Sequence, residues 1–372
     1  MSVLSTAILP LRLHHPDGST PVIVGEGALS SVLPELEDWL ARRTAFLVTT
    51  PRVHALHGDR LEVLRRAAAK WVILEVEEGE GAKTVSTAER LWNEMLDAGG
   101  KRDSRVIALG GGSVGDLAGF AAGCFLRGIE FVQIPTTLLA QVDAAIGGKT
   151  GVDLPGGKNT VGLFHHPWMV VGDTGVLSTL PREELRSGLA EVIKMAALLD
   201  PDLFGLVEEE LDLLLDGDAG ALGPVVAAAA AAKIAVVERD PTEKGERRLL
   251  NFGHTLGHAI ESACGYSGLR HGEAVGYGIL FALRLARRRG LAPEVAARVH
   301  RLILRLGLPR LPELSSEGLM AGMARDKKAR ESGLVWVLPR SLGEGWMTDG
   351  IPEQEVRGEL ADFLRDPLRR PI

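Results

Sequence analysis

The sequence predicts an α/β N-terminal domain with a parallel, Rossmann-like nucleotide-binding sheet, followed by an all-α C-terminal domain. In the first half, short β-rich runs alternate with helical stretches, which is typical of a parallel sheet with crossover helices. From Pro181 onward the pattern changes to one helix after another. A glycine-rich turn follows the strand expected at 105–109, as in nucleotide-binding sheets. We therefore expect an α/β nucleotide-binding domain over 1–177 and an α-helical domain over 178–372.

The first half contains five runs typical of strands and three typical of helices. β-Branched and aromatic residues between turn signals indicate strands, and apolar residues three or four positions apart indicate helices. The expected strands are 20–24, 44–49, 71–76, 105–109 and 129–134, and the expected helices are 29–42, 59–70 and 85–98.

The second half is expected to begin with a helix at Pro181. Proline suits the first turn of a helix, and Thr179 or the serine before it is placed to cap it. Glu184 and the glutamate before it favour the positive end of the helix dipole. The expected helices are 181–199, 203–215, 225–238, 254–263, 273–289, 293–306 and 316–325, and 334–338 is expected to be extended.

Composition excludes several classes of protein. The 372 residues are 45% hydrophobic and 24% charged, which is ordinary for a soluble globular protein. A net charge of −7 argues against a nucleic-acid partner, because such proteins carry a surplus of Lys and Arg. The first residues lack a basic segment followed by an apolar one, and no uninterrupted apolar run reaches the length of a membrane span. We therefore expect a cytoplasmic protein with no membrane partner.

The run from Asn251 to His258 predicts a metal site. His254 and His258 are four residues apart and project from one face of a helix, as Glu191 and Lys194 do on another. A carboxylate with two imidazoles leaves an open position on a zinc ion for substrate or water. Two histidines at this spacing are more often a capped or core pair, so the metal hypothesis depends on the features that agree with it.

The glycine-rich turn Gly110-Gly-Gly-Ser-Val-Gly-Asp116 precedes a helix expected to start near Asp116. Glycines permit close backbone approach, and a helix N-terminus attracts phosphate. In the usual dinucleotide fold this turn follows the first strand and has an acidic partner about 20 residues on. Here the turn follows a late strand and lacks an obvious partner. The pattern favours pyrophosphate binding by a sheet other than the usual Rossmann sheet, and a plain tight turn is the alternative.

Two further loops carry glycines, hydroxyls and lysines. One runs from Pro135 through Asp143 to Lys149, and the other is Gly156-Gly-Lys-Asn159, with Arg127 upstream of both. Such groups suit a substrate that bears phosphate or carboxylate. Taken singly, either loop is more often an exposed loop with solvated lysines, but their clustering favours a functional role.

Together these stretches resemble the 3-dehydroquinate synthases, a family of sugar phosphate cyclases, over nearly the whole chain. The stretches that carry the resemblance are Gly110–Asp116, Leu126-Arg-Gly128, Pro135-Thr-Thr137, Val142-Asp143, Ile146–Asp153, Gly157-Lys-Asn159, Thr179-Leu-Pro181, Ala190-Glu-Val-Ile-Lys194, Leu250–Thr255, Gly257–Glu261, His271–Val275 and Asp326-Lys-Lys328.

The resemblance implies a dehydroquinate synthase-like fold and a phosphorus–oxygen lyase. Its substrate would be 3-deoxy-D-arabino-heptulosonate 7-phosphate, and its products 3-dehydroquinate and phosphate, in the shikimate pathway of aromatic amino acid biosynthesis. NAD would be used transiently, because an alcohol is oxidised, phosphate is eliminated, the ketone is reduced again and the ring closes by an aldol step. A homodimer is also implied, in which Arg127 reaches across the interface to the phosphate.

The resemblance also implies roles for individual residues. Glu191, His254 and His271 would bind a divalent zinc or cobalt ion, and His258 would transfer protons. The other catalytic residues would be Lys149, Asn159, Lys194, Arg247 and Asn251, and the substrate would also contact Arg127, Asp143, Lys233 and one of Lys327 and Lys328. The NAD-binding site would be lined by Glu80, Lys83, Gly111, Gly112, Asp116, Thr136, Thr137, Lys149, Lys158, Thr179 and Glu184.

The sequence departs from the family pattern after the second expected strand. Thr50 and Arg52 stand where the family usually has an Asp and an Asn that contact the cofactor, which puts those contacts in doubt. Ala144 and Ala145 replace a usual pair of serines. The alternatives are an NAD-linked, metal-dependent polyol or alcohol dehydrogenase on the same scaffold, a cyclase for another sugar phosphate, and a non-catalytic binding homologue.

Overall fold

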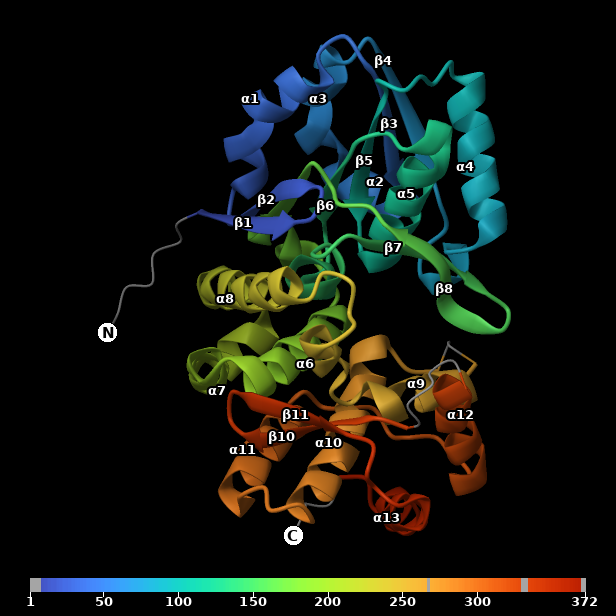
Figure 1. The fold of residues 1–372 in the computed structure, drawn as a ribbon. Helices are drawn as coiled ribbons and strands as arrows, with labels where there is room; N and C mark the ends of the chain where they lie inside the picture. The colour runs from blue at the N-terminus through green and yellow to red at the C-terminus, as the bar shows by residue number, and fades with distance from the viewer. Residues whose placement is uncertain (1–7, 266–267, 329–333, 369–372) are drawn as a thin grey trace. The chain divides into compact units, whose positions relative to one another are not determined.

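The structure is a computed structural model that describes residues 8–265, 268–328 and 334–368. The chain forms two compact units (Figure 1). The first unit contains Met1–Pro181 and Gly217–Pro241, and the second contains Arg182–Asp216 and Thr242–Ile372. The chain therefore passes between the units three times, whereas the expected division at residue 177 has a single crossing. The two additional crossings arise because the helix at 219–239 belongs to the first unit.

A seven-stranded sheet is the centre of the first unit. Its order is β1-β2-β9-β6-β5-β3-β4, and all neighbours are parallel except β1 and β2. This confirms the predicted parallel sheet. The strands are β1 (Leu9–His15), β2 (Gly18–Gly25), β3 (Thr44–Thr49), β4 (Lys70–Glu75), β5 (Arg105–Gly110), β6 (Phe131–Pro135) and β9 (Met169–Asp173).

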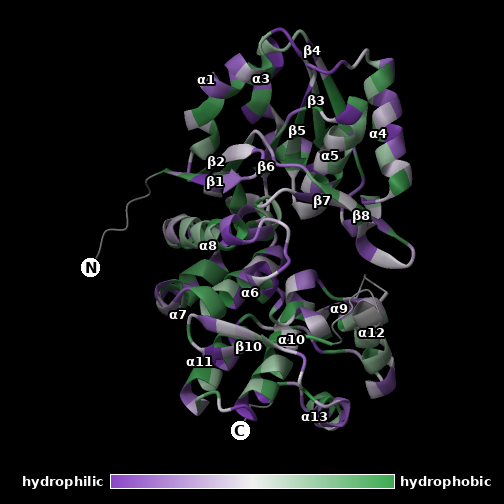
Figure 2. Ribbon diagram, viewed as in Figure 1, coloured by the Kyte–Doolittle hydropathy of each residue, from purple (hydrophilic) through white to green (hydrophobic). Residues whose placement is uncertain are grey.

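Alternate residues of the central strands face two separate cores. On β3, Ala45 and Leu47 join the core under α1 (Ala28–Leu40) and α3 (Glu62–Ala67). Phe46 and Val48, one position along, join the core under α4 (Val85–Asp97) and α5 (Gly112–Cys124). Successive side chains of a strand point to opposite faces, so helices cover both faces of the sheet. Figure 2 shows β3 and β5 coloured as hydrophobic between these helices.

A hairpin and a long helix complete the first unit. The hairpin pairs β7 (Lys149–Leu154) with β8 (Gly157–Phe164) in an antiparallel register. Helix α8 (Ala219–Arg239) packs against β1, β2 and the π-helix η4 (Ala140–Ala144). By length and composition alone, α8 is apolar enough to cross a membrane, with a mean hydropathy of 1.8, although Lys233 interrupts its apolar run, as expected from the sequence. Within the structure 61% of that stretch is buried, as in the core helix of a globular protein.

The second unit is built around α10 (His271–Arg287), which packs against several helices and a strand of this unit. The all-α prediction needs one correction. The segment expected to be extended, 334–338, forms part of an antiparallel hairpin. The other elements are α6 (Arg182–Leu199), α7 (Pro201–Asp216), the 3-10 helix η6 (Glu246–Asn251), α9 (His254–Ala263), α11 (Pro293–Arg305), α12 (Ser316–Lys328), β10 (Trp336–Ser341), β11 (Glu344–Thr348) and α13 (Glu353–Arg365).

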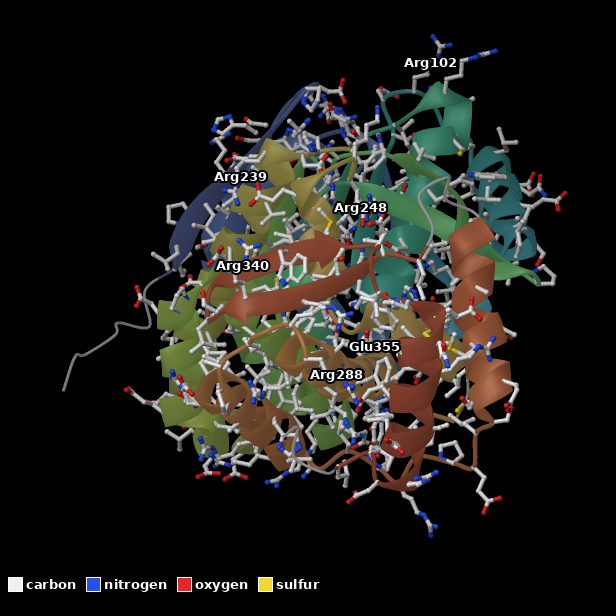
Figure 3. All side chains as sticks on the ribbon, turned by 60° about the horizontal axis from the view of Figure 1, so that its bottom comes forward. Arg102, Arg239, Arg248, Arg288, Arg340 and Glu355 are labelled. Atoms are coloured by element: carbon white, nitrogen blue, oxygen red, sulfur yellow. The ribbon has the colours of Figure 1, made fainter. Side chains whose placement is uncertain are left out.

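Ion pairs fasten α13 to the C-terminal end of α10. Glu359 forms ion pairs with Arg284 and Arg288, one on each carboxylate oxygen and both at 2.7 Å. Arg289 donates two hydrogen bonds to Glu355, at 2.8 and 3.1 Å. Figure 3 labels Arg288 and Glu355 in this region. Bidentate and doubly accepted pairs fix the orientation of the partners, so α13 is held on α10 in one register.

Candidate active site and metal centre

Glu191 and Lys194 lie on the inner face of α6 in the second unit. Both side chains are buried, at 0% and 1% exposure, and the Lys194 ammonium pairs with the Glu191 carboxylate. Their spacing of three residues places them on one face of the helix. A buried carboxylate requires compensating charge. Lys194 supplies one positive charge, and two imidazoles approach the same carboxylate.

His254 begins α9 directly after Gly253, which has a left-handed φ of 79°. A Cβ atom on Gly253 would lie 2.7 Å from the carbonyl oxygen of Val275, so only glycine lets α9 start this close to α10. His254 Nε2 lies 3.8 Å from Glu191 Oε1. Its Nδ1 lies 3.1 Å from the carbonyl oxygen of Phe252, which fixes the tautomer with Nδ1 protonated. The Nε2 lone pair therefore faces the carboxylate.

His271 begins α10 and also approaches Oε1 of Glu191. Its Nε2 lies 3.6 Å from Glu191 Oε1, and its Nδ1 lies 3.4 Å from Glu261 Oε2. The ligand atoms of Glu191, His254 and His271 all lie within 4.8 Å of one another. In metal sites, histidine ligands usually donate the other ring N–H to a carbonyl or carboxylate. Both histidines have such an acceptor, so the three residues form a candidate metal centre.

The two histidines differ in their affinity for a proton. Burial and the nearby Lys194 charge hold the pKa of His254 well below its usual value, so this ring is neutral at pH 7. Burial alone would lower the pKa of His271, but the hydrogen bond to Glu261 and the charge of Glu191 outweigh it and raise the pKa. A metal ion at this site competes with a proton for His271.

His258 lies beside the three candidate ligands without belonging to them. Its ring centroid lies 5.2 Å from that of His254 and 6.3 Å from that of His271. His258 and Asn251 line a pocket in the second unit, and Asn251 donates a hydrogen bond of 2.8 Å to Glu243. The other lining residues are Arg248, His254, Thr255, Val335, Val337 and Met347. Arg247 is 1% exposed and is not among the lining residues, whereas its neighbour Arg248 is.

The glycine-rich turn lies in the first unit, at the carboxyl end of β5. Helix α5 begins at Gly112 with Gly111 as its N-cap, four residues earlier than the sequence suggests. A Cβ atom on Gly111 would lie 3.0 Å from Thr137, and one on Gly110 would lie 2.6 Å from Val114. The glycines therefore bring the turn close to the chain that follows β6. The open helix N-terminus offers backbone N–H groups to a phosphate.

A buried lysine links the other candidate cofactor residues of the first unit. Lys83 Nζ lies 2.7 Å from Asp116 Oδ2 and 3.4 Å from Glu80 Oε1, and it also donates to the side chain of Asn159. Burial alone would lower the pKa of Lys83, but Asp116 and Glu80 outweigh it and raise the pKa. Ser113 donates a hydrogen bond of 2.7 Å to Glu80. The lysine is thus held as a cation beside the glycine-rich turn.

The remaining predicted residues of the first unit lie in three places. Asp143, on η4, forms an ion pair with Lys233 of α8. Lys149 begins β7, and Lys158 and Asn159 lie at the start of β8. Thr136 and Thr137 follow β6, Thr179 hydrogen-bonds His57 at 3.0 Å, and Arg127 is exposed with a left-handed φ of 73°.

Three further predicted residues belong to the second unit. Glu184 accepts a hydrogen bond of 2.7 Å from Arg270, the residue before α10. Lys327 and Lys328 end α12, and their side chains lie outside the described part of the structure. Of the two departures, Thr50 is buried and caps α2 (Pro51–His57) by accepting from Val53 N–H at 3.3 Å, and Arg52 is exposed.

Sequence reasoning assigned no role to Glu261 or Ser113. Glu261 lies seven residues after His254, which is two turns along the same helix face, so helical spacing alone was a usable signal. It is buried, at 2% exposure, and holds Nδ1 of His271. Ser113 lies inside the glycine-rich turn, and its sequence position carried no sign that it meets Glu80.

Comparison with known proteins decides the family. The family profile described as 3-dehydroquinate synthase N-terminal matches residues 73–187, and the one described as 3-dehydroquinate synthase C-terminal matches residues 188–329. The chain belongs to the 3-dehydroquinate synthase family. The 3-dehydroquinate synthase of Symbiobacterium thermophilum is 44% identical over 357 residues, which cover 93% of this chain and 98% of that protein. That of Pelotomaculum thermopropionicum is 43% identical over 350 residues, which cover 93% of each chain.

Solved structures confirm the dehydroquinate synthase-like fold. The 2-epi-5-epi-valiolone synthase of Streptomyces hygroscopicus, with NAD+ and Zn2+ bound, has a TM-score of 0.85 and 30% identity, covering 93% of this chain and 97% of that one. A 2-deoxy-scyllo-inosose synthase, complexed with carbaglucose-6-phosphate, NAD+ and Co2+, has a TM-score of 0.85 and 27% identity, covering 95% and 99%. An iron-containing alcohol dehydrogenase has a TM-score of 0.70 at 18% identity, which shows a shared fold alone.

Proposed function

We propose that the chain is a 3-dehydroquinate synthase that converts 3-deoxy-D-arabino-heptulosonate 7-phosphate to 3-dehydroquinate and phosphate. The observation that carries the proposal is the convergence of Glu191, His254 and His271 within 4.8 Å, in a chain 44% identical to a 3-dehydroquinate synthase. The donor set suits a catalytic divalent metal, because three protein ligands leave a position open. The substrate is expected to enter beside these ligands, where His258 and Asn251 line a pocket.

A divalent zinc or cobalt ion on the three ligands would polarise a substrate hydroxyl, and NAD would take up a hydride and return it. The residues of the chain supply the remaining chemistry. We assign proton transfer to His258, because its ring lies beside both histidine ligands. Lys194 lies against the Glu191 carboxylate, and its charge is placed to stabilise a developing anion.

The cofactor is assigned to the first unit. The open N-terminus of α5 and the glycines before it are assigned to the pyrophosphate. The residues assigned to NAD are Glu80, Lys83, Gly111, Gly112, Asp116, Thr136, Thr137, Lys149, Lys158 and Thr179, with Glu184 of the second unit. Since the Thr50 hydroxyl already caps α2, we assign no cofactor contact to it. The division into an NAD-binding domain over 1–177 and a metal- and substrate-binding domain over 178–372 is part of this proposal.

The substrate's phosphate, carboxylate and hydroxyls are assigned to charged and amide side chains. Asp143 and Lys233 already form an ion pair, and this pair supports a shared binding role for the two residues. The residues assigned to the substrate are Arg127, Asp143, Lys149, Asn159, Lys194, Lys233, Arg247, Asn251 and one of Lys327 and Lys328. Arg127 would act across the interface of a homodimer. The chain would work in the cytoplasm, in the shikimate pathway.

The alternatives have weaker support. The likeness to an alcohol dehydrogenase extends only to the fold, at 18% identity. The cyclases for other sugar phosphates are 30% and 27% identical, well below the 44% of a 3-dehydroquinate synthase. The test is turnover of the heptulosonate phosphate with a catalytic amount of NAD. We expect stoichiometric phosphate and 3-dehydroquinate without accumulation of NADH, and NADH accumulation from a polyol without phosphate release would favour the dehydrogenase.

A further inference from the structure

Asp153 of β7 lies between two residues of the proposed cofactor and substrate sites. Its backbone N–H donates a hydrogen bond of 2.7 Å to the carbonyl oxygen of Lys83, and the neighbouring Thr84 forms a parallel bridge with it. Its carboxylate Oδ1 accepts a hydrogen bond of 2.6 Å from the backbone N–H of Asn159. One residue therefore fixes the main chain of both Lys83 and Asn159.

Asn159 needs this support because of its backbone. Its φ of 54° lies in the left-handed region, which is unfavourable for a residue with a Cβ atom even though asparagine tolerates it better than most. A carboxylate that accepts from a backbone N–H is a strong, charge-assisted hydrogen bond. The bond to Asp153 therefore stabilises the left-handed turn that starts β8.

The left-handed turn determines where the Asn159 side chain points. Its amide oxygen accepts a hydrogen bond from Nζ of Lys83, which is 3% exposed and is also paired with Asp116. Asn159 of the proposed substrate set thus meets Lys83 of the proposed cofactor set within the first unit. The Asp153 charge also helps to raise the pKa of Lys83, but it ranks behind Asp116 and Glu80, so we assign the effect of Asp153 to its main-chain contacts.

We propose that Asp153 is a positioning residue whose hydrogen bonds to the main chains of Lys83 and Asn159 align these two side chains for NAD and for the sugar phosphate. This inference rests on the proposed function. It requires an oxygen acceptor at position 153, and the negative charge is of secondary importance. A hairpin that Asp153 merely stabilises would predict a loss of thermal stability without a change in binding.

The test compares Asp153→Ala with Asp153→Asn, because the amide retains the oxygen acceptor. We expect Asp153→Ala to raise both the KM for the heptulosonate phosphate and the Kd for NAD about tenfold, the effect of one such hydrogen bond. The kcat should fall less than these affinities, because the metal ligands and His258 lie on other elements of the structure. Asp153→Asn should be affected less than Asp153→Ala, because its amide oxygen keeps the acceptor and only the charge assistance is lost. Leu154→Ala is the matched control, since Leu154 is the next residue of the hairpin and is 42% exposed.

Two measurements make the outcome independent of turnover. The Kd for NAD is measured by calorimetry, and hydrogen exchange of the amides at 157–160 should accelerate more in Asp153→Ala than in Asp153→Asn. If Asp153→Ala does not fold, Asp153→Val repeats the test with a residue that favours strands but lacks the acceptor.

The proposal is overturned if Asp153→Ala binds NAD and substrate as the wild-type enzyme does, or if Asp153→Asn is as defective as Asp153→Ala. A wild-type enzyme that releases no phosphate from the heptulosonate would refute the proposed function instead. In that case the NAD affinity and the exchange rates still decide the role of Asp153.

Discussion

Nδ1 of His271 lies 3.4 Å from Oε2 of Glu261, a buried residue that is not one of the three candidate metal ligands. Glu261 lies on α9, the helix that begins with His254. One helix therefore supplies a ligand at its first residue and the partner of a second ligand two turns later. Partners of this kind orient the imidazole and raise its affinity for a metal.

Replacing Glu261 with Gln should weaken metal binding. The variant loses the charge that favours the protonated Nδ1 of His271, so we expect a 10- to 100-fold loss of affinity, in order of magnitude. The measurement is a titration of the metal-free protein with Co2+ followed by absorbance. Ser262→Ala, one residue along, is the control and should bind as the wild-type protein does. Equal affinity for Glu261→Gln would contradict the assigned role.

Removing the charge of Lys194 should abolish phosphate release. Lys194→Met keeps the length of the apolar stem but leaves the Glu191 carboxylate without its ammonium partner. We expect loss of turnover together with a stability loss of about 3 kcal/mol, because one member of a buried pair is removed. Denaturant unfolding shows whether the variant is folded. A folded variant with near-normal phosphate release would refute the proposed role of Lys194.

Removal of the metal by a chelator should inactivate the enzyme reversibly. Metal affinity depends on the pKa of the ligands, and the raised pKa of His271 means that protons compete with the metal as the pH falls. We therefore expect a chelator to inactivate the protein faster at about pH 6 than at about pH 8. Added Zn2+ or Co2+ should restore activity. Activity that survives exhaustive chelation would show that the metal hypothesis is wrong.

Two glycines should respond to alanine in opposite directions. Gly253→Ala places a Cβ atom 2.7 Å from the carbonyl oxygen of Val275 at a φ of 79°, so we expect a loss of about 2 kcal/mol or more in the free energy of unfolding. Gly205→Ala, inside α7 with nothing within 4 Å of the added atom, should gain about 0.5 kcal/mol. Denaturant unfolding checks both, and a neutral Gly253→Ala would contradict the close approach of α9 and α10.

The Arg289–Glu355 pair should make a pH-dependent contribution to stability. The hydrogen bonds from Arg289 lower the pKa of Glu355 below its ordinary 4.5. A lowered folded-state pKa means that the contribution is present above about pH 4.5 and is lost as the pH falls through the folded-state value. We expect Glu355→Gln to cost about 0.5 kcal/mol at pH 7 and nothing near about pH 2, measured by urea unfolding.

The matched control for this pair is Glu353→Gln. Glu353 lies on the same helix but is 63% exposed, and it pairs with Arg357. An exposed pair contributes little, so this variant should unfold with the same free energy as the wild-type protein. A cost for Glu355→Gln that does not change with pH would show that packing, and not the charge, is responsible.

The sequence predicted the parts of the fold that follow from local patterns. The strand that contains Phe46 and Val48 is buried on both faces and lies between clear turn signals, so its type and bounds were predictable. Strand β1 was missed because Leu13 is its one fully buried residue, which leaves no alternation to detect. The placement of α8 with the first unit was also missed, since only tertiary contacts determine which core an apolar helix joins.

The candidate metal centre was predictable to a similar degree. Helical spacing placed Glu191 with Lys194 and His254 with His258, but spacing cannot decide which histidine accompanies His254 at the carboxylate. That choice came from the family resemblance, and the structure brings His271 to Glu191 at 3.6 Å. The contact between Asp153 and Asn159 depends on the hairpin register, which composition does not determine.

The most direct measurement of the central claim is a crystal structure of the protein soaked with Zn2+ or Co2+, with anomalous data collected at the metal edge. The account predicts one strong peak bonded to Glu191 and to Nε2 of both His254 and His271, at about 2.0–2.2 Å from each ligand atom. His258 should lie beside this peak without binding it. A peak bound by His258 in place of His271, or no ion between these side chains at saturating metal, would contradict the account.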